Sequence, residues 1–492
     1  MTETAKKKRG MPSSFTILLA LLAIVAVITV IVSGTSGGAV TAARLSDFCT
    51  APIKGFADAL PVCLFVMILG GFLGMMTETG ALDNGIAVLV QKLKGNEIML
   101  IPVLMLIFSL GGTTYGMCEE TVPFYALLAA TMMAAGFDPM VGAATVLLGA
   151  GCGCLGSTVN PFAVGAAVDA LTGVDIAVNQ SIIIGLGAVL WIVTTVMSIV
   201  FVMNYAKKVK ADKGSTILSM QELKDAEEAH GKAASEVHKE VKLTGRQKGV
   251  LIAFAFTFVV MIVGFIPLAD LNEGVANFFD AGAVYDADGN AIVQGWSALI
   301  TGLPIGQWYF DEASTWFFLM AILIGIIGGL SEKQIVNTFI TGAADMMSVV
   351  LVIALARGIS VLMANTGLDK YVLNAAADAL AGLSGVIFAP MSFLVYFGLS
   401  FLIPSTSGMA TVSMPIMGPL AVKLGFSPEV MVMIFSAAIG VVNLFTPTSG
   451  AIMGGLALAK IEWTTWLKFA LKLIVALSVV CAVILTVACV LL

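Results

Sequence analysis

The sequence predicts an all-α polytopic membrane protein built from two inverted repeats, and three observations lead to this prediction. First, 59% of the 492 residues are hydrophobic and only 11% are charged, with a mean hydropathy of +1.01. Ordinary soluble proteins carry about 25% charged residues, so a soluble fold could not cover this much apolar surface. Second, apolar runs long enough to cross a bilayer recur along the chain. Third, polar motifs of the first half return in the second.

The same composition excludes several other classes of protein. A chain this apolar is not expected to be a nucleic-acid-binding protein, a disulfide scaffold or a disordered protein. Its seven cysteines lie almost entirely in apolar stretches without paired spacing, and Cys152 and Cys154 among glycines fit small packing residues better than metal ligands. Both histidines, His230 and His238, lie in the most polar segment. We therefore expect no cofactor, and no histidine-ligated haem or zinc in the membrane.

Uninterrupted spanning helices account for most of the apolar sequence. A helix needs about 20 mostly apolar residues to cross a bilayer, and the candidates are 14–33, 59–77, 180–205, 249–268, 314–331, 343–364 and 466–490. The first of these follows a basic run, Lys6 to Arg9, and lacks an A-x-A cleavage site at the usual distance. We therefore expect it to be retained as a span and not removed as a signal peptide.

Four other apolar regions are interrupted. Regions 98–135 and 387–424 each bend at a short polar tip, which predicts two re-entrant hairpins. Regions 139–172 and 428–459 are broken by Gly, Pro, Ser, Thr and Asn, which predicts two broken helices. Unwound backbone at membrane depth is tolerated only where protein buries it or where it lines a cavity. The tips and breaks are therefore expected to converge on one internal, partly hydrated site.

Basic residues give the orientation. The N-terminus holds four of the 25 Lys and Arg residues, and segment 207–248 holds ten more. Because cytoplasmic loops are rich in Lys and Arg, both regions are expected in the cytoplasm. Counting crossings from there leaves 269–312 and the C-terminus outside. The predicted location is the cytoplasmic (inner) membrane of a prokaryote, with the lipid bilayer as one partner.

The polar segment between the halves has its own local signals. Ser219 followed by Glu222 forms a capping box, which predicts a short helix. We expect a solvated linker here, with a regulatory site as the alternative. In the outer loop, Asp286 to Asn290 superficially resembles a calcium loop but lacks the ligand pattern that ends in Glu, so a hairpin turn is favoured.

Self-comparison identifies the repeat. Four motifs recur in the same order about 290 positions later, and they pair 77–83 with 364–369, 113–117 with 405–409, 136–139 with 425–428, and 157–161 with 446–450. The topology above places the two copies in opposite orientation, and inverted repeats with broken helices are typical of transporters. The predicted domains are 1–206 (N-terminal span and first repeat), 207–299 (cytoplasmic linker, one span and outer loop) and 300–492 (second repeat).

The tips and breaks carry the candidate substrate ligands. Hydroxyls, amides and freed carbonyls at a helix break are hard oxygen ligands, and half-helix ends attract ions of opposite sign. The polar candidates are Thr113, Thr114, Ser157, Thr158, Asn160, Ser405, Thr406, Ser407, Thr446, Thr448 and Ser449. A coupled cation would be held at Asn160, Asn443 and Ser449. Such a hydroxyl in a membrane helix often bonds only its own backbone, which is the structural alternative.

Three charges interrupt the apolar sequence. Glu119 and Glu120 follow the first tip, and Arg357 lies in the run that starts at Val349. Charges within the membrane are functional by default because burying them is costly. Arg357 aligns with Gly70 of the first repeat, so its charge breaks the symmetry and indicates a substrate contact. The structural alternative is an Arg–Glu pair that locks two elements together.

Four segments carry a resemblance to a known family: 116–124, 149–161, 401–405 and 446–450. They resemble the YfcC-like branch of the anaerobic four-carbon dicarboxylate carrier family, over nearly the whole chain. The resemblance implies the ion transporter superfamily, whose better-known members are elevator-type homodimers with two re-entrant hairpins. Family naming is divided between dicarboxylates and basic amino acids. Sodium-coupled relatives carry Ser-Asn-Thr at both tips, whereas 113–116 and 405–408 differ, so protons or pure exchange are favoured over sodium.

The residues and the resemblance together predict a secondary active transporter, antiporter or symporter, for a small carboxylate-bearing metabolite. Arg357 suits one carboxylate, whereas Glu119 and Glu120 would repel a second and attract an ammonium or guanidinium group. An amino acid such as arginine or ornithine is therefore favoured over succinate, fumarate or malate, which is the alternative. A channel would need a continuous lined path. An enzyme is not expected, because no H-E-x-x-H or G-x-S-x-G pattern appears.

Overall fold

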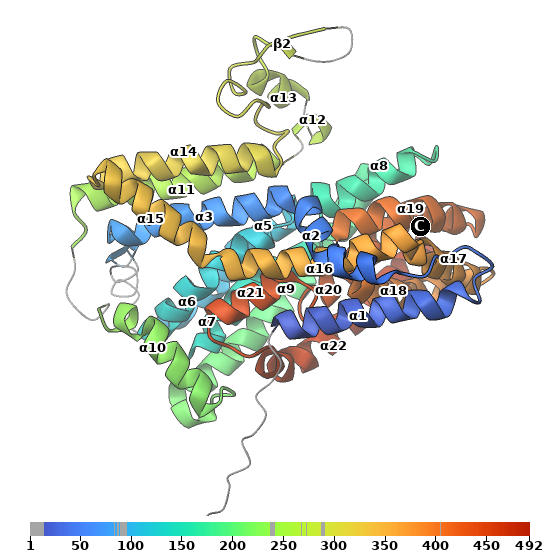
Figure 1. Cartoon of the computed structure of the whole chain (residues 1–492), viewed down its shortest axis with the longest axis horizontal. Helices are drawn as coiled ribbons and strands as arrows, with labels where there is room; N and C mark the ends of the chain where they lie inside the picture. The colour runs from blue at the N-terminus through green and yellow to red at the C-terminus, as the bar shows by residue number, and fades with distance from the viewer. Residues whose placement is uncertain are drawn as a thin grey trace, which may run out of the picture.

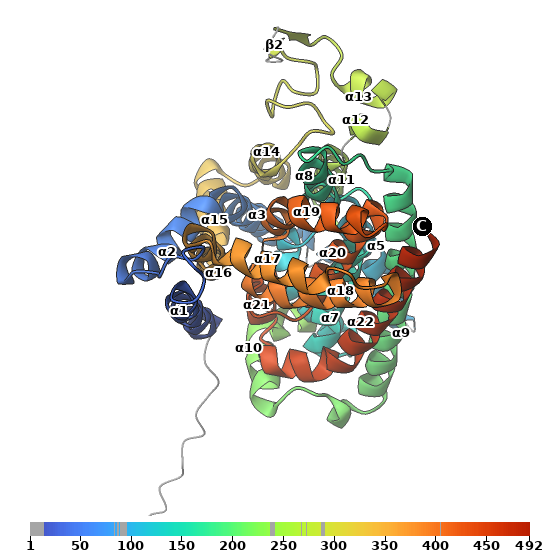
Figure 2. The same cartoon turned by 90° about the vertical axis from the view of Figure 1, so that its right-hand side faces the viewer.

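The structure, a computed structural model, is mostly helical. It describes residues 14–82, 84–85, 88, 96–236, 242–266, 268–271, 273–286, 291–403 and 405–492. The two views of Figures 1 and 2 show a helical body with a small, separate unit around α12, α13 and β2 standing above one face. Helices α9 and α22 lie on one side of this body and α1 and α2 on the opposite side (Figure 2).

The first half begins at α1 and ends with the long helix α9. Its helices are α1 (Ser14–Ser33), α2 (Leu45–Asp58), α3 (Leu60–Glu78), α5 (Leu100–Tyr115), α6 (Val122–Ala134), α7 (Pro139–Leu155), α8 (Ala166–Thr172) and α9 (Gln180–Ala211). Single helical turns add Glu97–Met99, Glu119–Thr121 and Pro161–Gly165. The predicted hairpin 98–135 is the pair α5–α6, and the predicted broken helix 139–172 is α7–α8.

The second half repeats this order from α14 to α22. Its helices are α14 (Phe310–Gly328), α15 (Glu332–Asp345), α16 (Met347–Thr366), α17 (Leu368–Leu380), α18 (Gly385–Leu402), α19 (Thr406–Lys423), α20 (Pro428–Val442), α21 (Gly450–Leu458) and α22 (Trp463–Leu491). The predicted hairpin 387–424 is α18–α19, and the predicted broken helix 428–459 is α20–α21. Both interrupted regions therefore fold as helix, break and helix, as expected.

Between the halves lie the linker and the outer loop. They contain the turn Lys213–Ser215, α10 (Met220–Glu236), α11 (Gly245–Phe265), α12 (Leu268–Leu271), α13 (Glu273–Phe279), β1 (Val284–Tyr285) and β2 (Ala291–Val293). The two strands pair antiparallel, which fits the expected hairpin, although 287–290 at its turn and His238 lie outside the described residues. The capping box exists: the backbone N–H of Ser219 donates to Glu222 at 2.8 Å, and Glu222 N–H donates to the Ser219 hydroxyl at 3.2 Å.

Helix α10 of the linker is exposed on most of its surface, but one stripe of it is docked, which the expectation of a solvated linker did not include. The side chains of Glu222 and His230 are buried, at 4% and 9% exposure. Glu222 also accepts the backbone N–H of Glu462 at 2.9 Å, and the His230 ring lies 3.1 Å from the carbonyl of Leu458. Helix α10 therefore docks on the α21–α22 connection and on α6. The charge pattern did not reveal this because one narrow stripe of the helix is buried while its other faces stay polar.

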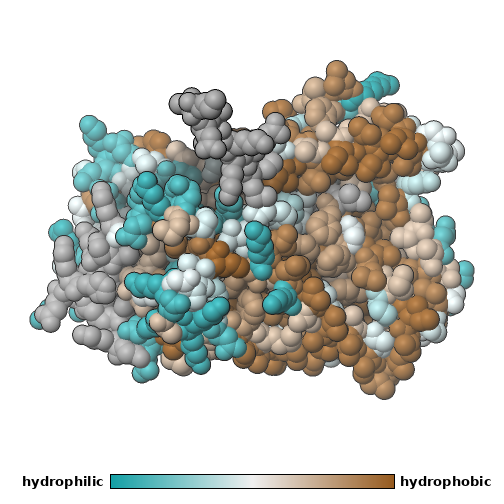
Figure 3. Space-filling model, turned by 90° about the horizontal axis from the view of Figure 1, so that it is seen from below, coloured by the Kyte–Doolittle hydropathy of each residue, from teal (hydrophilic) through white to brown (hydrophobic). Residues whose placement is uncertain are grey.

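Eight helices of the described chain are long and apolar enough to cross a bilayer. Seven are the expected spans, found as α1, α3, α9, α11, α14, α16 and α22, and the eighth, Glu97–Tyr115, contains the first limb of the first hairpin. Helix α22 exposes one continuous apolar stripe, formed by Leu471, Val475, Val479, Val483 and Val487. Figure 3 shows a broad apolar surface on this face and polar residues gathered toward the end where α10 lies.

Apart from the short helices α12 and α13 in the outer loop, three helices of the described chain were not expected from the sequence: α2, α15 and α17. Each carries charged residues among its apolar ones, such as Lys54 in α2 and Lys370 in α17, so none forms an uninterrupted apolar run. Helices α2 and α15 lie just before α3 and α16, and the junctions are the single residues Ala59 and Met346. They therefore extend two predicted spans into longer, bent rods.

Glycines let these rods cross at very short range. Helix α2 packs against α16, and α3 packs against α15. A Cβ on Gly55 would lie 2.3 Å from the backbone nitrogen of Gly358, and a Cβ on Gly70 would lie 2.5 Å from the carbonyl oxygen of Gly342. Any larger side chain would push the helices apart. Each crossing joins an element of one half to an element of the other.

The repeated motif at 136–139 and 425–428 has the same local function in both halves. Gly136 and Gly425 adopt left-handed φ angles of +86° and +83° and end the preceding helix. Asp138 and Ser427 then cap the next helix, accepting N–H groups of Val141 and Val430, and a proline follows as the first helical residue. The motif is therefore a helix stop and start signal, which is why it recurs.

Candidate functional site

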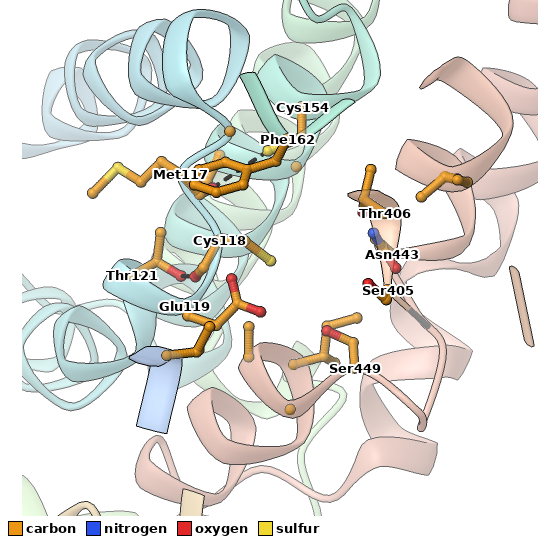
Figure 4. Close-up of a pocket in the computed structure, with 18 of the residues that line it drawn as sticks. Met117, Cys118, Glu119, Thr121, Cys154, Phe162, Ser405, Thr406, Asn443 and Ser449 are labelled. Atoms are coloured by element: carbon orange, nitrogen blue, oxygen red, sulfur yellow. Dashed lines mark hydrogen bonds between the residues drawn. The ribbon is translucent and has the colours of Figure 1, made fainter. Parts of the chain in front are cut away.

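The tips and breaks of both halves surround one cavity of about 180 Å³. A single water needs only about 10–15 Å³ on such a measure, so this space suits a small metabolite. Of the predicted ligands, those that line the cavity are Glu119, Glu120, Asn160, Arg357, Ser405, Thr406, Ser407, Thr448 and Ser449, together with Asn443 of the predicted cation site. Figure 4 shows Glu119 from the first half facing Ser405, Asn443 and Ser449 from the second.

Five predicted ligands are not among the lining residues: Thr113, Thr114, Ser157, Thr158 and Thr446. The Thr113 hydroxyl donates to the carbonyl of Gly156 at 2.6 Å, and the Thr158 N–H donates to the carbonyl of Thr113 at 2.9 Å. Thr114 donates to the carbonyl of Leu110 at 2.7 Å. The Thr114 contact is the structural alternative stated for such residues, a bond within its own helix. The contacts of Thr113 and Thr158 instead tie the first tip to the first break.

Asn160 belongs to both the cavity wall and the break. Its Oδ1 accepts the N–H groups of Phe162 and Ala163 at 2.9 and 3.3 Å, and its Nδ2 donates to the Ser157 hydroxyl at 2.9 Å. The side chain therefore caps the Pro161–Gly165 turn. Gly116, with φ of +82°, packs so closely that a Cβ there would lie 2.6 Å from Asn160 Oδ1. Only glycine fits this position of the first tip.

In the second half, the tip and the break are bonded separately. Ser405 caps α19 by accepting the Gly408 N–H at 3.1 Å, and the hydroxyls of Thr446 and Thr448 bond each other at 2.7 Å. Among the described residues, no hydrogen bond joins the second tip to the second break. The polar atoms of Asn443 and Ser449 are directed at the cavity (Figure 4). The second tip and the second break thus form a polar wall without charge.

The two adjacent glutamates have different surroundings. Glu120 is 1% exposed, and its Oε2 accepts the N–H of Cys118 at 3.0 Å, which closes the tip on itself. Glu119 is partly exposed and points into the cavity (Figure 4). Within the described chain, Glu119 forms no ion pair. A free carboxylate in a cavity wall attracts a cationic group.

Arg357 also lines the cavity and is paired, but not with a glutamate. Its Nε donates to Asp58 Oδ2 at 2.8 Å, so the expected Arg–Glu alternative is wrong in its partner. The reason is tertiary: α16 crosses α2 at Gly55 and Gly358, next to both charges. Asp58 ends α2 just ahead of the predicted span 59–77. The one sequence signal for this partner was an acidic residue at the start of the predicted span. Such a residue looks like an ordinary charge at the membrane interface, so it did not indicate a partner for Arg357.

Among the described residues, no cluster of three or more His, Cys, Asp or Glu side chains could hold a metal ion. Asn160, Asn443 and Ser449 do line the same cavity. The Asn160 oxygen already accepts two N–H groups, which weakens it as a cation ligand. The three residues predicted to bind a cation therefore lie around the same cavity, but they offer few oxygen atoms that are not already hydrogen-bonded.

Comparisons with known proteins give the following relationships. The family model described as DcuC, C4-dicarboxylate anaerobic carrier, matches residues 39–490. The chain is 28% identical over 445 residues to an uncharacterized protein of Haemophilus influenzae, covering 90% of this chain and 78% of the relative. It is 27% identical over 440 residues to the putative basic amino acid antiporter YfcC of Escherichia coli, covering 87% and 77%.

Two solved structures align over almost the full length at low identity. One is MtrF of Neisseria gonorrhoeae, described with a class of antimetabolite efflux pumps, at a TM-score of 0.43 and 17% identity, covering 98% of this chain and 96% of that one. The other is the YdaH transporter of Alcanivorax borkumensis, at a TM-score of 0.47 and 16% identity, covering 96% and 97%.

Proposed function

We propose that this chain, which belongs to the DcuC family of carriers, is a secondary active transporter for an amino acid such as arginine or ornithine. The family model matches residues 39–490, so the chain is a membrane transporter. Transport proceeds by alternating access of the cavity between the two tips. The observation that carries this proposal is the cavity itself, where Arg357 and the free carboxylate of Glu119 line one small space.

The charges of the cavity favour an amino acid over a dicarboxylate. The Arg357 guanidinium presents a fork that suits one carboxylate, and the Glu119 carboxylate suits the ammonium or guanidinium group of the same molecule. Arg357 is the only basic residue among those that line the cavity. A dicarboxylate would need a second cationic contact. The name of the Escherichia coli relative, a putative basic amino acid antiporter, supports the same choice.

A four-carbon dicarboxylate such as succinate, fumarate or malate is the second candidate, because the family description names that substrate class. Protonation of Glu119, or a cation bound beside it, would reverse the local sign and admit such a substrate. For coupling we favour protons or pure exchange over sodium, since few free oxygens face a cation at Asn160, Asn443 and Ser449.

We also propose an elevator architecture with two inverted repeats. The order α2–α3, α5–α6, α7–α8 and α9 recurs as α15–α16, α18–α19, α20–α21 and α22, and α2–α3 packs against α15–α16. Both observations support repeats related by a pseudo-twofold axis. The hairpins re-enter the membrane and move with the broken helices, while the outer spans form the scaffold of a homodimer. The N-terminus lies in the cytoplasm and the C-terminus outside the inner membrane.

Counterflow into proteoliposomes, with a panel of amino acids and dicarboxylates, tests the substrate. We expect exchange of arginine or ornithine, its loss in Arg357→Ala, and a selective loss of cationic substrates in Glu119→Gln. Glu120→Gln should weaken the same substrates through the shape of the tip. Robust succinate uptake that is unchanged in both glutamate variants, with no arginine or ornithine counterflow, would contradict the amino acid assignment in favour of a dicarboxylate carrier.

A further inference from the structure

Asp58 lies directly behind the arginine of the cavity wall. It is the last residue of α2, and the next residues toward α3, Ala59 and Val62, line the cavity. Its carboxylate accepts the Arg357 Nε–H at 2.8 Å, with side-chain exposures of 52% for Asp58 and 25% for Arg357. The ion pair therefore lies at the edge of the cavity, where Arg357 separates Asp58 from the space inside.

The backbone fixes this pair in place. Next to Arg357, a Cβ on Gly358 would lie 2.8 Å from the carbonyl oxygen of Ala51, and the Gly55 contact on the other side is still closer. Helices α2 and α16 are thus in direct backbone contact within one turn of both charges. The pair is imposed by a helix crossing, which distinguishes it from a surface salt bridge between two flexible side chains.

The pairing leaves part of the guanidinium free. Asp58 bonds Nε on one edge of the fork, and the guanidinium forms no other ion pair or hydrogen bond with the described residues. A guanidinium has five donors in a rigid plane, so its two terminal nitrogens still suit one carboxylate. Asp58 therefore both orients Arg357 and balances its charge.

The charge balance of the site follows from this pair. Arg357 is the one basic group here among the described residues, whereas Asp58, Glu119 and Glu120 are three acidic groups, so the acidic groups outnumber the basic one. A substrate with one carboxylate and two cationic groups complements this balance. A dicarboxylate would add its second negative charge to a site that is already negative, and like charges in contact are costly.

Resting on the proposed function, we infer that Asp58 is the specificity-determining residue of this transporter: by neutralising Arg357 it makes the cavity select cationic amino acids against dicarboxylates. Asp58 does not contact the substrate and acts through Arg357 as a positioning residue. Replacing it with a neutral residue of the same shape frees one positive charge in the site. The preference should then shift toward anions.

The test is competition in proteoliposomes that contain wild-type protein, Asp58→Asn, Asp58→Glu or Asp378→Asn. Arginine and succinate each compete against labelled arginine exchange, and the ratio of their half-inhibitory concentrations is measured along with KM and maximal rate. Asp58→Asn should move the ratio toward succinate by about tenfold, the factor that roughly 1.4 kcal/mol gives. Asp58→Glu should restore the wild-type ratio. Asp378→Asn changes an exposed aspartate of α17 that forms no ion pair in the described chain, and it should match wild type.

The outcomes separate the two proposals. Suppose that the wild type exchanges arginine, and that Asp58→Asn leaves the ratio of half-inhibitory concentrations unchanged, whether or not exchange becomes slower. Asp58 then has only a structural role, and the inference is wrong while the proposed function stands. If the wild type exchanges neither amino acids nor dicarboxylates, the proposed function fails and the inference fails with it.

Discussion

The two hairpins with their broken helices share one sequence pattern but are held in different ways. In the first half, Thr113 of the tip bonds the break at Gly156 and Thr158, and Gly116 packs against Asn160. In the second half, no hydrogen bond joins the tip to the break within the residues that the structure describes. The break is held instead from α22, where the indole N–H groups of Trp463 and Trp466 donate to the carbonyls of Phe445 and Leu444. The first half also carries the glutamates of the site, whereas the second contributes Arg357 and otherwise neutral polar groups.

This difference indicates that the two hairpins have different roles, one fixed and one mobile. Hydrogen bonds between tip and break make the first half a single rigid wall that holds Glu119 in a fixed position. The second tip lacks such bonds, so it can separate from its break without leaving buried groups unsatisfied. We therefore expect the second hairpin to open more readily, with the first hairpin as the fixed reference.

The largest effect should come from Gly116→Ala, which disrupts the first tip. The substitution places a Cβ in a left-handed backbone, at a cost of roughly 1–2 kcal/mol, and against the Asn160 amide. We expect a lower Tm in detergent and loss of transport. The matched control is Gly398→Ala in the second hairpin, where a Cβ would meet nothing within 4 Å. There the change should be neutral or slightly stabilising, and equal damage from both variants would contradict the comparison.

Next in size is Thr113→Val, which keeps the side-chain shape but removes the hydroxyl between tip and break. The carbonyl of Gly156 loses its donor, and an unsatisfied buried group costs about 1–3 kcal/mol. The counterpart in the second half is Ser405→Ala, which removes a helix cap at a cost of about 1 kcal/mol. Thermal unfolding of both variants should rank Thr113→Val as the more destabilised. The reverse order would mean that the first tip is not held by this bond.

A smaller effect, a difference in local opening, should be visible in the unmodified protein. Amide hydrogen exchange should be faster at the second tip (residues 405–409) than at the first (113–118), because no hydrogen bond to the break must be broken for the second tip to open locally. The substrate should slow exchange in both. Equal protection of the two tips without substrate would remove the basis for treating the second hairpin as the mobile one.

The smallest effect concerns α10, which joins the two halves on the polar side. Burial, followed in effect by the charge of Lys460, lowers the pKa of His230 below its usual value of 6.5, and the bond to Leu458 only partly opposes this shift. The docked helix therefore binds fewer protons than the undocked one, so docking is complete above about pH 6.5 and weakens as the pH falls below it. Proteolysis of α10 should accelerate between pH 7 and 5 in wild type. His230→Gln should remove this dependence, and a pH dependence that persists in the variant would exclude His230 as its cause.

Much of this molecule could be predicted from the sequence because the bilayer imposes simple local rules. Seven spans follow from apolar length, as α22 and α9 illustrate, and the interrupted helices follow from proline, glycine and polar residues inside apolar runs. The recurrence of the motif at 136–139 and 425–428 identified equivalent elements. These features are local, since each depends on the transfer of one segment into lipid or on the capping of one helix.

Within the candidate site, the sequence identified the correct segments but not the function of each residue in them. Thr113 and Thr158 have the same composition signal as Thr406 and Ser449, yet the first pair bonds backbone and the second pair lines the cavity. Whether a hydroxyl faces a cavity or a carbonyl depends on the packing of its neighbours. No spacing rule along a single chain distinguishes the two cases.

The sequence by itself determined the class of the protein and its candidate spans, and it predicted the recurring motifs and the charged candidates of the site, because the energetic cost of placing polar groups in lipid arises segment by segment. Only the tertiary structure decided that Arg357 pairs with Asp58, that Glu120 closes the tip while Glu119 faces the cavity, and that α10 docks on the second half. These contacts join residues brought together by helix crossings, and a crossing depends on the surfaces of two helices at once, which neither segment encodes alone.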